Sequence, residues 1–158
     1  MENQSQNTSD LNAQADSCMK LGQQYLGQGE TKAALPFLDR ATKLKPLSPK
    51  AWTLLGNAYM ILGDYQRARV SLTNAHQINP KNYFLYLAEG IMLTTEKKYT
   101  QAVPVFLQAV QLNPKNAQVH FHLGLCFHAQ QNFQKAALAF ENACKLDPAY
   151  KEKIKFVK

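Results

Sequence analysis

The chain has 158 residues, 46% of them hydrophobic and 18% charged, and a formal net charge of +7. This length suffices for one domain with a hydrophobic core, and the basic balance raises the question of a nucleic-acid partner. No stretch approaches the length of a membrane span, and the first ten residues lack the parts of a secretory signal. The three cysteines form no CxxC pair, so we expect a reduced, cytoplasmic protein without a membrane segment.

A 34-residue period runs through most of the chain, because Pro46, Pro80, Pro114 and Pro148 stand 34 residues apart. The clearest unit is residues 49–82. It has the spacing W-x2-L-G-x2-Y, then A-x3-[F/L]-x2-A, then P, at Trp52, Leu55, Gly56, Tyr59, Ala68, Leu72, Ala75 and Pro80. Units 15–48, 83–116 and 117–150 keep the same phase. This period and spacing are typical of a helix–turn–helix repeat that buries its apolar face only by stacking.

Residues 15–150 resemble four consecutive tetratricopeptide repeats. The resemblance implies an all-α fold, a right-handed superhelical solenoid of stacked helix–turn–helix repeats, with the first helices lining a concave groove. It also implies a protein without enzymatic activity or cofactors that binds protein or peptide segments as an adaptor or chaperone.

The two ends of the chain lie outside this pattern. Residues 1–9 are polar and predict a disordered N-terminal tail, with Ser9 or Asp10 capping the first helix. Residues 10–158 predict a single tetratricopeptide domain, in which residues 151–158 form a short capping helix.

Local residues predict where helices begin and where they approach closely. Ser48 before Pro49 indicates a helix start, and Asp64 after Gly63 indicates another. A glycine recurs inside each first helix, and we expect it to face a small alanine of the second helix, as Gly56 would face Ala68. The third repeat departs from the pattern at three places, Glu89, Leu93 and the glycine-free junction Lys97–Lys98.

The family resemblance also predicts a ligand-binding face, formed by first-helix residues that point away from the packing signature. These are Met19, Gln23 and Leu26 in repeat one, Lys50, Thr53, Asn57 and Met60 in repeat two, Phe84, Leu87, Ile91 and Thr94 in repeat three, and Gln118, Phe121, Leu125 and His128 in repeat four. The face is largely apolar, and such a surface usually marks a partner site. The partner is therefore expected to be a peptide or protein segment with apolar side chains. Coverage by the N-terminal tail or by a second copy, as a homodimer, is the alternative.

Narrower functions were weighed against this one. An apolar concave face also resembles the cytoplasmic chaperones of type III secretion that hold translocator proteins, although those have three degenerate repeats. RNA binding is a second alternative, but the lysines lie mainly in turns and the terminal helix, away from this face. His122 and Cys126 have the spacing of two zinc ligands on a helix, but the sequence predicts packing residues there and no metal. No phosphate-binding loop or catalytic motif is present, so we expect no enzyme.

Overall fold

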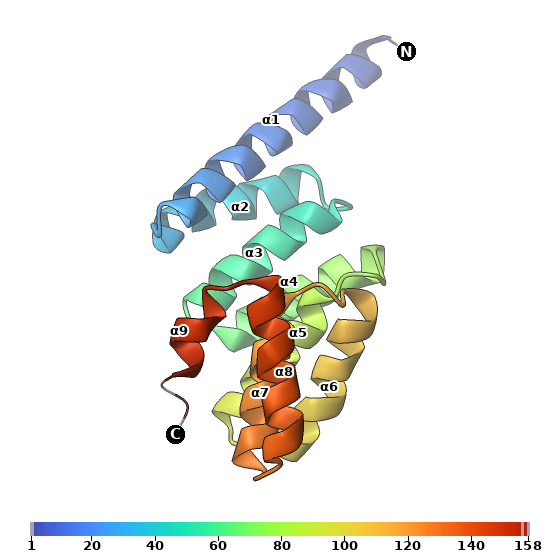
Figure 1. Ribbon diagram of the computed structural model, residues 1–158. Helices are drawn as coiled ribbons and strands as arrows, with labels where there is room; N and C mark the ends of the chain where they lie inside the picture. Colours follow the sequence, from blue (N-terminus) through green and yellow to red (C-terminus); the bar gives the residue numbers. More distant parts are fainter. Residues whose placement is uncertain (1, 156, 158) are drawn as a thin grey trace. The chain divides into compact units, whose positions relative to one another are not determined.

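A computed structural model describes the backbone of residues 2–155 and 157, and the side chains of this range from residue 8 onward. Within the described residues the chain is helical and has no strand (Figure 1). The helices are α1 Glu2–Gly27, α2 Thr31–Leu44, α3 Pro49–Ile61, α4 Tyr65–Ile78, α5 Phe84–Thr95, α6 Tyr99–Leu112, α7 Ala117–Ala129, α8 Phe133–Leu146 and α9 Tyr150–Ile154. These bounds confirm the predicted pairs of first and second helices and the all-α solenoid class.

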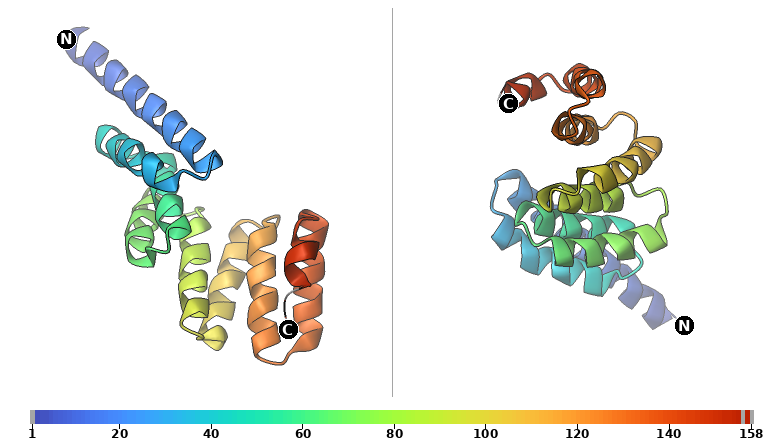
Figure 2. Two further views of the ribbon diagram at one scale, coloured as in Figure 1. Left: turned by 90° about the vertical axis from the view of Figure 1, so that its left-hand side faces the viewer. Right: turned by 90° about the horizontal axis from the view of Figure 1, so that it is seen from below.

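The helices form two compact units, Met1–Asn82 and Tyr83–Lys158. The division falls between repeats two and three, so each unit holds two complete repeats. In unit 1, α2 packs against both α1 and α3, and α3 packs against α4 (Figure 2). In unit 2, α6 packs in the same way against α5 and α7, and α7 packs against α8. That residues 10–158 act as one domain stays a prediction.

Both predicted helix starts are confirmed by side-chain capping. The Ser48 hydroxyl accepts a hydrogen bond from the Ala51 amide at 3.2 Å, and the Asp64 carboxylate accepts one from the Arg67 amide at 3.1 Å. In unit 2 the Asn116 and Asn132 side chains cap α7 and α8 in the same way. Each bond satisfies an amide that has no partner inside its own helix.

The glycine of each first helix makes room for a bulky side chain, which corrects the prediction of an alanine partner. A Cβ atom added at any of the four glycines would overlap a side chain of the paired second helix. The pairs are Gly22 with Leu38, Gly56 with Leu72, Gly90 with Phe106 and Gly124 with Phe140. The large residue fills the space between the helices, and the glycine is where it enters.

The turn inside each repeat needs one residue with left-handed backbone geometry. Gly29 and Gly63 supply it in unit 1, with φ angles of 79° and 75°. In unit 2 the equivalent residues are Lys97 and Gln131, with φ angles of 59° and 60°. This conformation costs a residue with a Cβ atom about 1–2 kcal/mol, so unit 2 carries strain that unit 1 avoids.

Both ends differ from prediction. Helix α1 begins at Glu2, so residues 2–9 are helical where the sequence predicts a disordered tail and a cap at Ser9 or Asp10. The segment holds no proline or glycine, and a helix already formed by the repeat can continue through such residues at little cost. At the other end the helical part of the predicted cap stops at Ile154, and residues 156 and 158 lie outside the described residues. Of the described helices, none combines the length and the apolar character that crossing a membrane requires.

Candidate functional site

The predicted face occupies four places in each repeat. Counting the first residue of a repeat as one, they are the second, fifth, ninth and twelfth residues. Neighbouring first helices lie against one another within each unit, α1 against α3 and α5 against α7. The structure therefore brings the predicted residues of repeats one and two together in unit 1, and those of repeats three and four together in unit 2.

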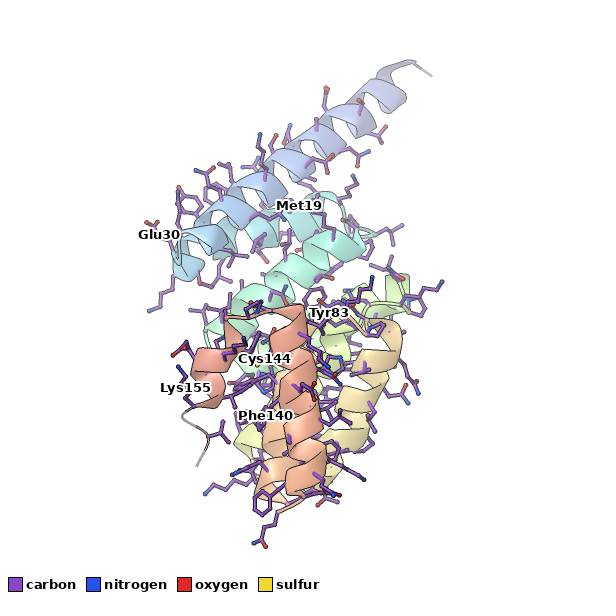
Figure 3. All side chains as sticks on the ribbon, in the orientation of Figure 1. Met19, Glu30, Tyr83, Phe140, Cys144 and Lys155 are labelled. Atoms are coloured by element: carbon purple, nitrogen blue, oxygen red, sulfur yellow. The ribbon has the colours of Figure 1, made fainter. Side chains whose placement is uncertain are left out.

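The fifth-position residues are not ligand contacts in two of the repeats, which corrects the prediction for Met19 and Leu87. Both side chains are buried. Met19, labelled in Figure 3, lies in a small core with Ala41 of α2 and Ala51 of α3. Leu87 belongs to the main core of unit 2. Helix phase puts the fifth residue on the outward side of its own pair, but the next first helix then packs over it.

The other two fifth-position residues take part in the same joint. The Asn82 side-chain amide donates to the Thr53 hydroxyl at 2.6 Å, and that hydroxyl donates to the Pro49 carbonyl at 2.7 Å. The Phe121 ring lies 5.1 Å from the ring of Tyr150, between centroids. Each side chain thus contacts the residue that opens the next repeat, and so supports the stacking.

Met19 shows this relationship as well. The Ser48 hydroxyl lies 4.0 Å from the Met19 sulfur, and these residues are also 29 apart in the chain. Sequence reasoning missed the joint because it assigned faces from helix periodicity within one repeat. The signal that could have found it is the pairing of the fifth residue with the residue 29 positions later.

The remaining predicted residues are accessible to different degrees. Fully exposed are Gln23, Lys50 and Gln118. Partly buried are Leu26, Asn57, Met60, Phe84, Ile91, Thr94, Leu125 and His128. The accessible part is therefore mixed in unit 1 and mainly apolar in unit 2.

Several of these side chains already have fixed positions. The Thr94 hydroxyl donates to the Ile91 carbonyl at 2.7 Å, and the Phe84 ring stacks on that of Tyr83 with centroids 4.2 Å apart. The His128 imidazole meets the Phe133 ring edge-on at 5.5 Å. Tyr83 is held in turn, since its hydroxyl accepts a hydrogen bond from the Asn116 amide at 3.0 Å. An apolar ligand would therefore meet a preorganised surface on α5 and α7.

His122 and Cys126, the zinc-spaced pair, are packing residues. The His122 ring stacks on Phe106 at 5.5 Å, and burial, with a smaller contribution from Lys153, lowers the pKa of His122 to about 4. Burial raises the pKa of the Cys126 thiol to about 12, so it stays protonated, whereas a metal ligand must be a thiolate. Among the described residues no group of three or more histidine, cysteine or acidic side chains is arranged to hold a metal.

A cavity of about 340 Å³ lies on unit 1 outside the predicted face. Its lining comes from α3 and α4 and comprises Leu55, Tyr59, Gln66, Arg67, Val70 and Ser71. The Arg67 guanidinium lies 5.7 Å from the centre of the Tyr59 ring and pairs with Asp64 at 3.4 Å. No sequence signal pointed to this cavity, because it depends on the space left between side chains of two helices.

Comparison with known families decides the class of the chain. Three family models, each described as tetratricopeptide repeat, match residues 15–46, 49–82 and 95–151. The chain belongs to the tetratricopeptide repeat family. These matches leave out residues 83–94, the part of the third repeat that contains the departures at Glu89 and Leu93.

Individual relatives are much longer or are related mainly through the repeats. The chain is 30% identical over 102 residues to BBSome complex member BBS4 of Bos taurus, an alignment that covers 65% of this chain and 20% of that protein. The chain thus spans about a fifth of this curated relative.

Solved structures share the architecture. MamA from Desulfovibrio magneticus RS-1 is 26% identical with a TM-score of 0.68, covering 91% of this chain and 83% of that one. PilF of Pseudomonas aeruginosa is 25% identical with a TM-score of 0.71, covering 88% of this chain and 64% of that one. These likenesses confirm the repeat solenoid.

Proposed function

We propose that this tetratricopeptide protein binds a peptide or protein segment with apolar side chains on the accessible face of its first helices, as an adaptor or chaperone. The observation that carries this proposal is the surface of unit 2, where Ile91 on α5 and Leu125 on α7 are half-exposed on neighbouring helices. Burying each such side chain under a ligand contributes about 1–2 kcal/mol. The name of the relative BBS4, a member of a protein complex, is in keeping with a role in protein assembly.

The polar residues of the face suit an additional role in orienting the ligand. Asn57 and Gln23 in unit 1 have side-chain amides that can pair with a ligand backbone. Thr94, which we also expected to do so, already donates its hydroxyl proton to a carbonyl of its own helix and retains only acceptor capacity. Lys50 is the one lysine among the predicted residues, so the face offers little to an acidic ligand.

A peptide selection tests the proposal directly. Binders from a random peptide display library should be enriched in apolar residues. Their affinity should fall at least tenfold with the double variant Ile91→Gln, Leu125→Gln. The matched control is Leu138→Gln, which changes an exposed leucine on the second helix α8 and should leave affinity unchanged. Equal loss in both variants, or no loss in the first, would refute the proposed face.

Phe84 and Phe121, the strongest apolar positions by sequence, are poorer test sites. The Phe121 ring packs on Phe140 and Tyr150, so its removal would also loosen α7, α8 and α9. Ile91 and Leu125 separate binding from folding more cleanly.

The narrower assignments remain proposals that the same reagents can test. A translocator chaperone of the type III secretion kind would keep one apolar segment soluble in the cytoplasm, and a purified translocator segment should then compete with the selected peptides. RNA binding would appear as a gel shift that weakens steeply with salt. A homodimer formed through this face would be detected by loss of self-association in the double variant Ile91→Gln, Leu125→Gln.

A further inference from the structure

Helix α1 is twice as long as the other first helices. It has 26 residues, whereas α3, α5 and α7 have 13, 12 and 13. At 1.5 Å per residue it is about 39 Å long, and about half of it lies beyond the repeat. In Figures 1 and 2 this half extends past the end of α2 in unit 1. A polar helical segment of this length is marginal alone in water, so a packing partner would stabilise it.

One side of α1 carries a row of residues with the spacing of a helix–helix contact. The row consists of Leu11, Gln14, Cys18 and Leu21, separated by three, four and three residues. This is the alternation that brings side chains to the seam of paired helices. Leu11 and Leu21 are 38% and 41% exposed, so the seam is open. We call these four residues the α1 seam.

The lower half of the α1 seam borders a groove between α1 and α2. The groove has a volume of about 620 Å³ and is lined by Gln14, Ser17, Cys18, Leu21, Pro36, Phe37 and Arg40. The Phe37 ring is fixed by stacking on Tyr25 with centroids 5.5 Å apart. An apolar, partly rigid channel therefore runs alongside the seam.

The equivalent surface is covered by a helix elsewhere in the chain. Leu21 is the seventh residue of its repeat, and the seventh residues Leu55 and Leu123 are each only 4% exposed. Leu55 is buried with Leu38 of α2, the second helix of the preceding repeat. Leu123 is buried in the same way with Phe106 of α6. Repeat one thus presents a surface that accepts a helix in repeats two and four.

We propose that the α1 seam pairs with the α1 seam of a second copy, with the two helices antiparallel about a two-fold axis near Asp16. In this arrangement Leu11 of each copy faces Leu21 of the other, and Gln14 faces Cys18. The row is therefore complementary to itself when reversed, as a two-fold interface requires. A single amide among apolar seam residues is a common device for setting the register of paired helices.

The other end of the chain does not offer a competing match. In unit 2 the ring of Tyr150, from α9, packs on Phe121 of α7. The exposed side of α8 carries a Glu141–Lys145 ion pair at 2.6 Å. A polar surface of this kind does not suit the apolar α1 seam, so pairing of like ends is favoured over a head-to-tail chain. This interface is separate from the proposed peptide-binding face and does not depend on it.

Sedimentation equilibrium of the full chain tests the proposal. The native chain should have twice the 17.8 kDa mass of one copy, and Leu21→Asp should reduce it to the mass of one copy at the same concentrations. Leu11→Asp lies outside the repeat and should do the same without affecting repeat packing. Val70→Asp, an exposed apolar position on α4, is the matched control and should leave the dimer intact. A native chain that stays monomeric into the millimolar range would refute the pairing, as would a dimer that survives Leu11→Asp or dissociates with Val70→Asp.

Cysteine oxidation tests the direction of the helices. A Gln14→Cys, Cys18→Ser chain mixed with the native chain should form a disulfide-linked pair, mapped by mass spectrometry to positions 14 and 18. Neither chain alone should link efficiently through α1. Strong linkage of native Cys18 to itself would show parallel helices and overturn the antiparallel arrangement.

Discussion

Replacing Lys97 and Gln131 by glycine should stabilise unit 2. Both residues hold the left-handed geometry that Gly29 and Gly63 supply in unit 1. Relief of about 1–2 kcal/mol at each turn is partly offset by the extra unfolded-state freedom of glycine, about 0.5–1 kcal/mol. The pair of substitutions should therefore raise the free energy of unfolding by about 1–2 kcal/mol, and the melting temperature by about 4 °C for a chain of this size.

Urea and thermal unfolding followed by circular dichroism measure this change. Lys97→Asn should give part of the gain, because asparagine tolerates the left-handed region, whereas Lys97→Ala should give none. These controls separate backbone strain from loss of the lysine charge. If alanine stabilised as much as glycine, or glycine gave no gain, the strain attributed to φ angles of 59° and 60° would be wrong.

Three further changes test the packing of unit 2. Gly90→Ala should destabilise by about 1–3 kcal/mol, because its Cβ would overlap the Phe106 ring, and urea titration should show a lower midpoint. Asn116→Ala should cost about 1–2 kcal/mol in the same assay by removing the cap of α7 and the hydrogen bond to Tyr83; no loss would mean that water replaces both. His122 should make stability fall as pH drops from about 6.5 to about 4, because its pKa is about 4 in the folded protein and 6.5 when unfolded, so the unfolded chain binds more protons in that window. The full effect is about 3 kcal/mol, and His122→Phe should remove it from the pH profile; an unchanged profile would contradict the assignment.

The position of the fifth-position residues changes how the peptide-binding face should be tested. Met19 and Leu87 are core residues, so substituting them would reduce folding and binding together. The ninth residues of repeats three and four, Ile91 and Leu125, remain on the accessible side of α5 and α7. Variants at these two positions therefore distinguish a ligand contact from a structural one.

The sequence by itself determined the repeat length, the helix pairs and the helix starts at Ser48 and Asp64. These features depend on local chemistry, namely the period of apolar residues, a hydroxyl or carboxylate next to free amides, and the residues that end helices. The family of the chain followed from the same pattern. The departure of the third repeat from the pattern at Glu89 could be seen there as well.

Only the tertiary structure decided which residues of a predicted face remain accessible, because burial depends on side chains from another repeat. Met19 is covered by the start of the next repeat, 29 residues later, whereas the equally apolar Leu21 is exposed because no helix precedes α1 in the structure. Helix periodicity assigns a side to each residue but cannot say whether a neighbouring helix occupies that side. The α1 seam, which periodicity alone would place in a core, is open for this reason.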